Sequence, residues 1–242
     1  MRSFAYRSVL VALILLGGPG SLHAANITVA GRTLSIDLPP SYCALDRGDP
    51  AEDEMFRIME RIQAGMNRVL VVFYDCAELA RMRRGESNTF DRYGQILTPI
   101  KEQAYPGITR EVYFAELAKV FDRAFAIGAR LGQESIGEVI PEIQIGEARS
   151  LGVLETDEAA LYAGMLEKIA FEGEEFTVAA VISMTLVKDV PVSINLYRPY
   201  EGDASLDLLL MEQQRFLRRL VQENEVLEGR LAPVPGPSAN GS

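Results

Sequence analysis

Histidine is nearly missing from this chain, because His23 is the only one among its 242 residues. His23 lies in a predicted export signal, so the mature protein is expected to have no imidazole at all. Ser-His-Asp and Cys-His nucleophiles both need an imidazole to accept and return a proton. Histidine-containing zinc sites and imidazole pH switches are excluded on the same ground. Any chemistry must therefore rest on carboxylates, lysine, tyrosine, serine, threonine or a hard metal ion.

Cysteine is scarce too, with Cys43 and Cys76 as the two in the chain. Two cysteines cannot build a four-thiolate zinc site. In an exported protein, an even number of cysteines is most simply explained by a disulfide. A redox pair is the alternative, but redox cysteines are usually two residues apart at a helix N-terminus. The sequence therefore predicts a structural Cys43–Cys76 disulfide.

Glycine-rich phosphate-binding loops are also lacking, since neither G-x-G-x-x-G nor a P-loop occurs. The segment 132–137 (GQESIG) resembles a nucleophile elbow, but its first glycine is one place too far from the serine and no histidine can activate it. We interpret this segment as the end of a helix followed by a loop. The sequence thus predicts no catalytic, cofactor-binding or metal-ligating residues, and no cofactor.

Positive charge is in deficit, with 24 Lys and Arg against 34 Asp and Glu and a net charge of −10. An acidic surface repels phosphate backbones and anionic lipid head groups. Nucleic acid and membrane surfaces are therefore not expected as partners.

The densest acidic cluster is better explained by a helix start than by a metal site. Its members are Asp46, Asp49, Glu52, Asp53 and Glu54. They lack the alternating oxygen ligands and central glycine of a calcium loop. Instead, Asp49 is a favourable N-cap, Pro50 suits the first helical position, and Glu52 stands where a capping-box carboxylate reaches back.

The first 24 residues have the layout of a secretory signal peptide. Arg2 and Arg7 supply the positive start, residues 9–16 form a short apolar run, and Leu22 and Ala24 occupy the two positions that a signal peptidase inspects. The alternative, an uncleaved membrane anchor, conflicts with a run far shorter than the ~20 residues of a spanning helix. We expect cleavage after Ala24, no stable membrane insertion, and a periplasmic or secreted mature protein.

Hydrophobic periodicity predicts one α+β domain over 25–231, with an antiparallel sheet and flanking helices. The predicted strands are 27–29, 34–38, 69–74, 143–154, 161–171, 176–187 and 192–197, with 93–100 as a strand or extended segment; 161–168 is also compatible with a helix. Helices are predicted from Asp49 and over 109–131 and 205–228, with a polar loop at 81–88. The last four strands follow one another with short turns, which is typical of a meander. The Pro- and Gly-rich segment 232–242 is predicted to be a disordered tail.

Two groups of polar residues are candidate sites. Arg198 lies between Tyr197 and Tyr200 at a strand end, where an arginine among aromatic rings can contact an anionic or planar ligand or a partner. The alternative is a strand edge leading into a turn. Glycosidase chemistry needs only an acid and a second carboxylate, and 172–175 offers three glutamates. The alternative there is a solvated hairpin turn.

The order of elements resembles the Mog1/PsbP-like superfamily of α/β/α sandwiches. The resemblance rests on the first hairpin with its exit, 34–42 (LSIDLPPSY), on the antiparallel strands around 181–200, and on the closing helix from Ser205. The superfamily includes exported bacterial proteins of the DcrB type. It implies no shared catalytic set, so no functional residue is carried over.

Together these observations favour an exported, periplasmic, non-enzymatic protein that binds an envelope partner or supports assembly. A carboxylate-dependent hydrolase is one alternative, whose sign is two acids with raised pKa values converging in one cleft. A small-ligand binding module is the other, whose sign is an apolar pocket beneath the long helices. Bacterial origin is inferred because Asn26 and Asn240 begin sequons that a eukaryotic secretory pathway would glycosylate.

Overall fold

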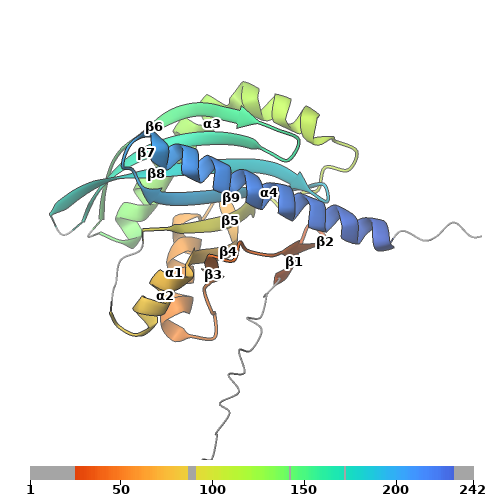
Figure 1. The fold of residues 1–242 in the computed structure, drawn as a ribbon. Coiled ribbons are helices and arrows are strands. Elements are labelled where there is room, and N and C mark those ends of the chain that lie inside the picture. Colours follow the sequence, from red (N-terminus) through yellow and green to blue (C-terminus); the bar gives the residue numbers. More distant parts are fainter. Residues whose placement is uncertain (1–24, 87–90, 142, 172, 232–242) are drawn as a thin grey trace, which may run out of the picture.

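The computed structural model describes residues 25–86, 91–141, 143–171 and 173–231 (Figure 1). The predicted signal peptide, 1–24, and the predicted disordered tail, 232–242, lie outside the described residues. Glu172, one of the three glutamates considered for hydrolysis, lies outside them too.

An antiparallel sheet of seven strands forms the centre of the structure, in the order β3-β4-β5-β9-β8-β7-β6. Its strands are β3 (Tyr42–Ala44), β4 (Asn67–Asp75), β5 (Tyr93–Pro99), β6 (Ile143–Thr156), β7 (Leu161–Phe171), β8 (Glu174–Val187) and β9 (Val190–Pro199). A separate hairpin comprises β1 (Ala25–Val29) and β2 (Arg32–Ile36). The predicted α+β class and the meander of the last four strands are confirmed, including a strand at 161–168.

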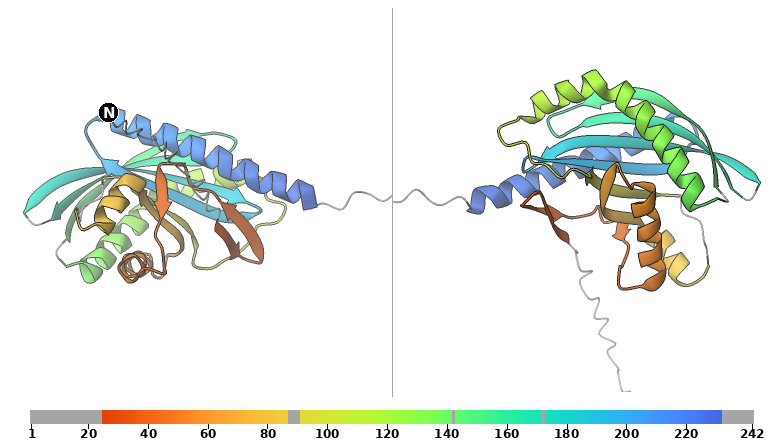
Figure 2. Two further views of the ribbon diagram at one scale, coloured as in Figure 1. Left: turned by 60° about the horizontal axis from the view of Figure 1, so that its bottom comes forward. Right: turned by 180° about the vertical axis from the view of Figure 1, so that it is seen from behind.

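Helices cover both faces of the sheet (Figures 1 and 2). One face carries α4 (Asp203–Leu231), and the other carries α1 (Pro50–Ile62), α2 (Cys76–Arg83) and α3 (Arg110–Val139). Alternate residues of each strand point to opposite faces, so neighbouring residues belong to different cores. Phe73 packs toward α4, whereas Val72 and Tyr74 pack with α1 and α2.

Buried polar side chains help to seat α4 on the sheet and the hairpin. The Asn224 amide accepts from the backbone N–H of Ser35 at 2.9 Å and donates to its carbonyl at 2.8 Å. The Gln213 amide donates to the Ser183 hydroxyl at 2.7 Å. Since unpaired polar groups are costly in a core, these contacts select one position of α4 along the strands.

The predicted start of α1 is confirmed. The Asp49 carboxylate accepts from the backbone N–H groups of Ala51 and Glu52 at 2.9 and 3.1 Å. The predicted capping box was wrong, because the N–H of Asp49 donates to the Asp46 carbonyl at 3.0 Å. The Glu52 carboxylate instead accepts from the N–H of Asp46 at 2.7 Å and pairs with Arg83 at 2.6 Å. The acidic cluster thus serves the helix start and its connection to α2.

Two predicted boundaries were wrong. The long helix does not end at Leu131, because α3 continues through 132–137 to Val139. Its extra turns lie against β6, where the Gln133 side chain donates to the Gly146 carbonyl. This tertiary contact outweighs the low helix propensity of glycine, which costs about 1 kcal/mol per residue relative to alanine. The predicted loop from Arg81 is also shorter, since Asp75 caps α2, which extends to Arg83.

Cys43 and Cys76 form a disulfide, with their sulfur atoms 2.06 Å apart. Cys43 lies in edge strand β3, and Cys76 is the first residue of α2. The predicted pairing is confirmed, and a disulfide is compatible with a secreted or periplasmic protein.

The part of the chain that the structure describes contains no helix with both the length and the apolar character needed to cross a membrane.

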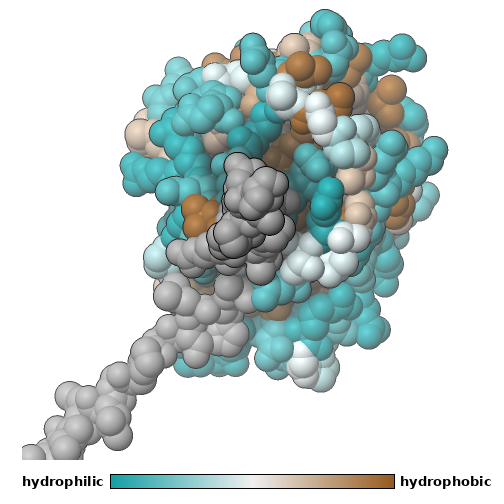
Figure 3. All heavy atoms as spheres, turned by 90° about the vertical axis from the view of Figure 1, so that its right-hand side faces the viewer, coloured by the Kyte–Doolittle hydropathy of each residue, from teal (hydrophilic) through white to brown (hydrophobic). Residues whose placement is uncertain are grey.

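Apolar surface is spread over several elements. Large apolar side chains that are 41–51% exposed include Val120 and Ile127 of α3, Met211 of α4 and Val153 of β6. The face shown in Figure 3 is largely hydrophilic, with small apolar patches between the polar side chains.

Candidate functional site

The predicted contact residues Tyr197, Arg198 and Tyr200 do not all lie on one face of the sheet. Tyr197 and Arg198 are consecutive in β9, so their side chains point to opposite faces of the sheet. The Nε of Arg198 is fully buried and has no hydrogen-bond partner within the described ranges. The Tyr200 hydroxyl donates to Asp203 at the start of α4, at 2.9 Å. The structure therefore separates Tyr197 from Arg198, and the ligand or partner contact expected of these three residues stays a prediction. Tyr197 enters a larger cluster on its own face of the sheet.

Tyr197 belongs to a row of three stacked tyrosines on the face that carries α1, α2 and α3. Tyr74, Tyr93 and Tyr197 stand opposite one another in β4, β5 and β9, with ring centroids 5.8 and 4.6 Å apart. Burial raises the pKa of each phenol, for Tyr93 well above its ordinary value. The row is thus neutral at physiological pH. Tyr74 and Tyr93 were not recognised in the sequence, because each follows an ordinary strand pattern.

Two side-chain amides hold Tyr197, the ring at the β9 end of this row. The Tyr197 hydroxyl accepts from the Gln95 amide at 3.1 Å and from the Asn195 amide at 3.3 Å. Asn195 in turn accepts from the Ser193 hydroxyl at 3.0 Å. The carbonyl oxygen of Gln95 is buried and has no partner among the described residues. The arrangement holds Tyr197 in place but offers no nucleophile with a base beside it.

Glu167 of β7 is the carboxylate with the most unusual surroundings on this face. It stands opposite Ala148 of β6 and Val178 of β8, and it is half-buried. Burial raises its pKa to about 7. Burial also raises the pKa of Glu223, but that residue belongs to α4 on the opposite face. The convergence of two such acids expected for a hydrolase is therefore not found in the described part of the chain.

Glu167 should make stability depend on pH. Its carboxyl binds a proton more tightly in the folded state, where the pKa is about 7, than at the ordinary value of 4.5. The stabilisation of the folded state by the protonated carboxyl is therefore complete below pH 4.5 and is lost as pH rises through 7. We expect Glu167→Gln to become more stable than wild type as pH rises from 5 to 8, because glutamine carries no charge to bury. The expected gain in the free energy of unfolding is about 2 kcal/mol, which is less than the full pKa shift implies, since solvent partly screens a half-buried group. Urea unfolding at several pH values measures this, and parallel wild-type and variant curves would contradict it.

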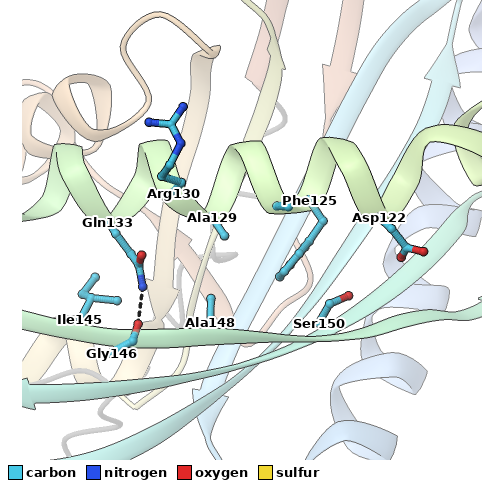
Figure 4. Close-up of a pocket in the computed structure, with 10 residues that line it drawn as sticks. Asp122, Phe125, Ala129, Arg130, Gln133, Ile145, Gly146, Ala148 and Ser150 are labelled. Carbon is cyan, nitrogen blue, oxygen red and sulfur yellow. Dashed lines mark hydrogen bonds between the residues drawn. The ribbon is translucent and has the colours of Figure 1, made fainter.

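An open groove of about 670 Å³ runs between α3 and β6 (Figure 4). Its walls are mainly small or apolar, and the lining residues are Asp122, Phe125, Ala126, Ala129, Arg130, Gln133, Ile145, Gly146, Ala148 and Ser150. Phe125 reaches from α3 toward β6, and the Gln133–Gly146 hydrogen bond joins the two walls near one end. This α3–β6 groove is an open, largely apolar hollow beside one long helix, whereas the sign set for a small-ligand module was an apolar pocket beneath the long helices.

In two further hollows the half-buried charged groups are already paired. One, of about 560 Å³, lies between α3 and the β6–β7 turn, where Asp157 accepts from Arg218 and from the Tyr162 hydroxyl. The other, of about 590 Å³, lies beside α2, where Arg92 pairs with Asp75 at 3.0 Å. Among the residues that the structure describes, neither hollow presents the unsatisfied buried charge that marks a ligand site.

Comparison with known proteins leaves these features to be judged by their geometry. No protein-family model matches the chain, and no curated protein matches it either.

Proposed function

We propose that this chain is an exported, disulfide-bonded, non-enzymatic binding protein, and that its α3–β6 groove holds an extended segment of a partner protein. The observation that carries the proposal is the groove itself, about 670 Å³ of open, largely apolar space along an edge strand. Binding sites for ligands are typically concave, mostly apolar and formed in advance.

The shape of the groove favours a polypeptide segment. The groove is open rather than enclosed, and three alanines, Ala126, Ala129 and Ala148, leave room between its walls. Asp122 of α3 and Ser150 of β6 also line the groove, so polar groups of an extended chain can be met there, whereas Arg130 is directed away from β6 and pairs with Glu134 at 2.7 Å. An enclosed pocket would instead favour a small molecule.

The partner is expected to bind through side chains and not by extending the sheet. β6 is an edge strand, which could in principle pair with another strand. However, its register with β7 shifts at three places, and the carbonyl of Gly146 is already occupied by Gln133. Such irregularities protect sheet edges from strand addition.

The proposed location of the protein, outside the cytoplasm, rests on the disulfide and on the predicted signal peptide. The disulfide supports an oxidising compartment, and the predicted signal peptide supports export to the periplasm or beyond. An envelope protein is the expected partner class. The resemblance to the Mog1/PsbP-like superfamily stays a prediction.

A small-ligand binding module is the second candidate, since the groove volume lies within the range of small-molecule sites. The kind of molecule that binds in the α3–β6 groove distinguishes the two functions. A binding module would take compact apolar molecules and would not select peptides.

Selection of peptides on the folded protein tests the proposal. The mature chain is presented to phage-displayed random 12-residue linear peptides, and the enriched peptides are measured against two variants. Ala126 and Ala124 are both exposed on α3, but only Ala126 lines the groove. We expect Ala126→Trp to weaken peptide binding by at least about tenfold, or 1.4 kcal/mol, and Ala124→Trp to leave it unchanged. Failure to enrich peptides, or equal binding to both variants, would overturn the proposal.

A further inference from the structure

We propose that the partner segment in the α3–β6 groove is basic, and that it continues along α3 into the hollow at the β6–β7 turn. The Asp122 carboxylate in the groove and the Glu111 carboxylate in that hollow then each bind a lysine or arginine side chain of the segment. The inference rests on the proposed function and adds the charge and the length of the bound segment. It follows from the residues that line the two hollows and from the pairing of the charges around them.

The two hollows are neighbours on one side of α3. Asp122 lines the α3–β6 groove, and Ala118 lines the hollow at the β6–β7 turn, which we call the turn hollow. Residues four apart are neighbours on a helix face, so the two hollows lie within one helical turn of each other. Between them β6 presents Val153, which is 41% exposed and stands opposite Ala163 of the core under α3. The lining residues of the turn hollow include Glu111, Ala115, Ala118, Thr156 and Glu158.

The length of the two hollows sets the length of the segment. Their lining residues on α3 run from Glu111 in the turn hollow to Gln133 in the groove. At a rise of about 1.5 Å per residue, this stretch of helix is roughly 33 Å long, of which roughly 16 Å from Asp122 onward belongs to the groove. An extended chain advances about 3.3 Å per residue, so the groove alone holds about five residues and both hollows together hold about ten.

The groove is polar at the end that adjoins the turn hollow. In Figure 4 the Asp122 carboxylate lies on the β6 side of α3, and the Ser150 hydroxyl of β6 points toward the same space. Phe125 comes next along the groove, followed by Ala129 of α3 and Ala148 of β6. A lysine or arginine side chain matches this order, because its charged head can bind the carboxylate while its apolar stem lies along the Phe125 ring.

Asp122 and Glu111 are exposed acids that have no ion pair or side-chain hydrogen bond among the residues whose side chains are described. The nearest lysine on α3, Lys119, already pairs with Glu116 at 2.6 Å. Arg123 follows Asp122 in sequence, but successive residues of a helix are about 100° apart around its axis, and Arg123 lines neither hollow. Both carboxylates are therefore available to a cation of a partner.

The basic residues around the two hollows are already engaged. Arg130 points away from β6 and pairs with Glu134 at 2.7 Å. At the other end, Arg218 pairs with Asp157 at 2.9 Å, and Arg110 pairs with a glutamate of α4. An acidic segment would consequently meet unpaired carboxylates without a free cation to compensate them. A basic segment meets complementary charge along the whole path.

The net charge of the chain adds a long-range preference of the same sign. With a net charge of −10, the protein attracts basic segments and repels acidic ones before contact. Because Asp122 and Glu111 are exposed, salt screens their attraction for a cation. Affinity for the segment should therefore fall as the salt concentration rises.

The charge is tested with the twelve-residue peptides that display on the mature chain enriches, in which we expect lysine and arginine to outnumber aspartate and glutamate. A fluorescent copy of the most enriched peptide is then titrated with wild type and variants at low and at physiological salt. Asp122→Asn and Glu111→Gln should each weaken binding about threefold at low salt, and the two together about tenfold. The matched control is Asp207→Asn, which removes the same charge from an exposed aspartate of α4 on the opposite face and should leave binding unchanged.

The length is tested by NMR on the isotope-labelled mature chain, with a nitroxide attached to one or the other end of the same peptide. One label should broaden the amide signals of Ala115 and Ala118 in the turn hollow, and the other should broaden those of Gln133 and Gly146 in the groove. Broadening by both labels in the groove alone would overturn the extension into the turn hollow.

The outcomes separate this inference from the proposed function. Enriched peptides that lack lysine and arginine, or that bind Asp122→Asn, Glu111→Gln and wild type equally, would overturn the basic segment. So would an equal loss of binding in Asp207→Asn. If those peptides are still weakened by Ala126→Trp, the groove stands as a peptide site of another chemistry. Failure to enrich any peptide would overturn both proposals.

Discussion

Replacing both Cys43 and Cys76 with serine is expected to lower the free energy of unfolding by about 4 kcal/mol. The bridge joins residues 33 positions apart and encloses α1 and β4. A link of this span restricts the unfolded chain far more than the folded one. Urea unfolding at pH 7 measures the effect, and the dependence of the free energy on urea should steepen because the unfolded chain expands.

Reduction provides the control for this prediction. Dithiothreitol should destabilise wild type by the same amount and leave the double serine variant unchanged. The loss should begin locally, because β3 has three residues and pairs on one side with β4. Hydrogen exchange at Tyr42–Ala44 should therefore accelerate before global unfolding. A loss of less than about 1 kcal/mol would show that the fold does not depend on the bridge.

Phe73→Ala is expected to cost about 4 kcal/mol, because it empties a fully buried position. Phe73 is 0% exposed and meets two rings edge to face, Tyr42 at 5.1 Å and Phe216 at 6.2 Å between centroids. Its ring also lies over Gly94, where an added Cβ would come within 2.4 Å of it. The variant therefore loses burial, aromatic contact and the close packing of β4, β5 and α4 together.

Phe176→Ala is the matched control, because the same truncation is made at a side chain that is 46% exposed in β8. It should change stability by less than about 0.5 kcal/mol. Both variants are measured by urea unfolding with the disulfide intact. If the two truncations cost similar amounts, Phe73 is not the packing centre that its contacts indicate.

Much of the fold could be predicted because its signals are local. Asp49 followed by Pro50 marks the start of α1, and the alternating runs after Ile143 mark four consecutive strands with short turns. The disulfide could also be predicted, since a chain with two cysteines allows a single intramolecular pairing. Local periodicity gives no comparable signal for α2, whose N-cap Asp75 is also the last residue of β4.

The candidate site could not be predicted in the same way, because its parts are distant in sequence. Tyr93 meets Tyr197 only because β5 pairs with β9, although four elements, α3, β6, β7 and β8, lie between these strands along the sequence. Glu167 looks like an ordinary charged residue in an alternating strand until the folded structure buries it in part. The α3–β6 groove likewise depends on how α3 lies against β6, two elements that the sequence gives no reason to place side by side with a hollow between them.

By itself, the sequence determined the α+β class, the antiparallel meander, the start of α1 and the one possible disulfide, and it excluded imidazole chemistry once the predicted signal is removed. The tertiary structure decided the length of α3, the tyrosine row, the surroundings of Glu167 and the groove. The physical reason is range: capping and periodicity act over a few residues, whereas strand order, burial and the gap between a helix and a sheet arise from contacts between distant segments.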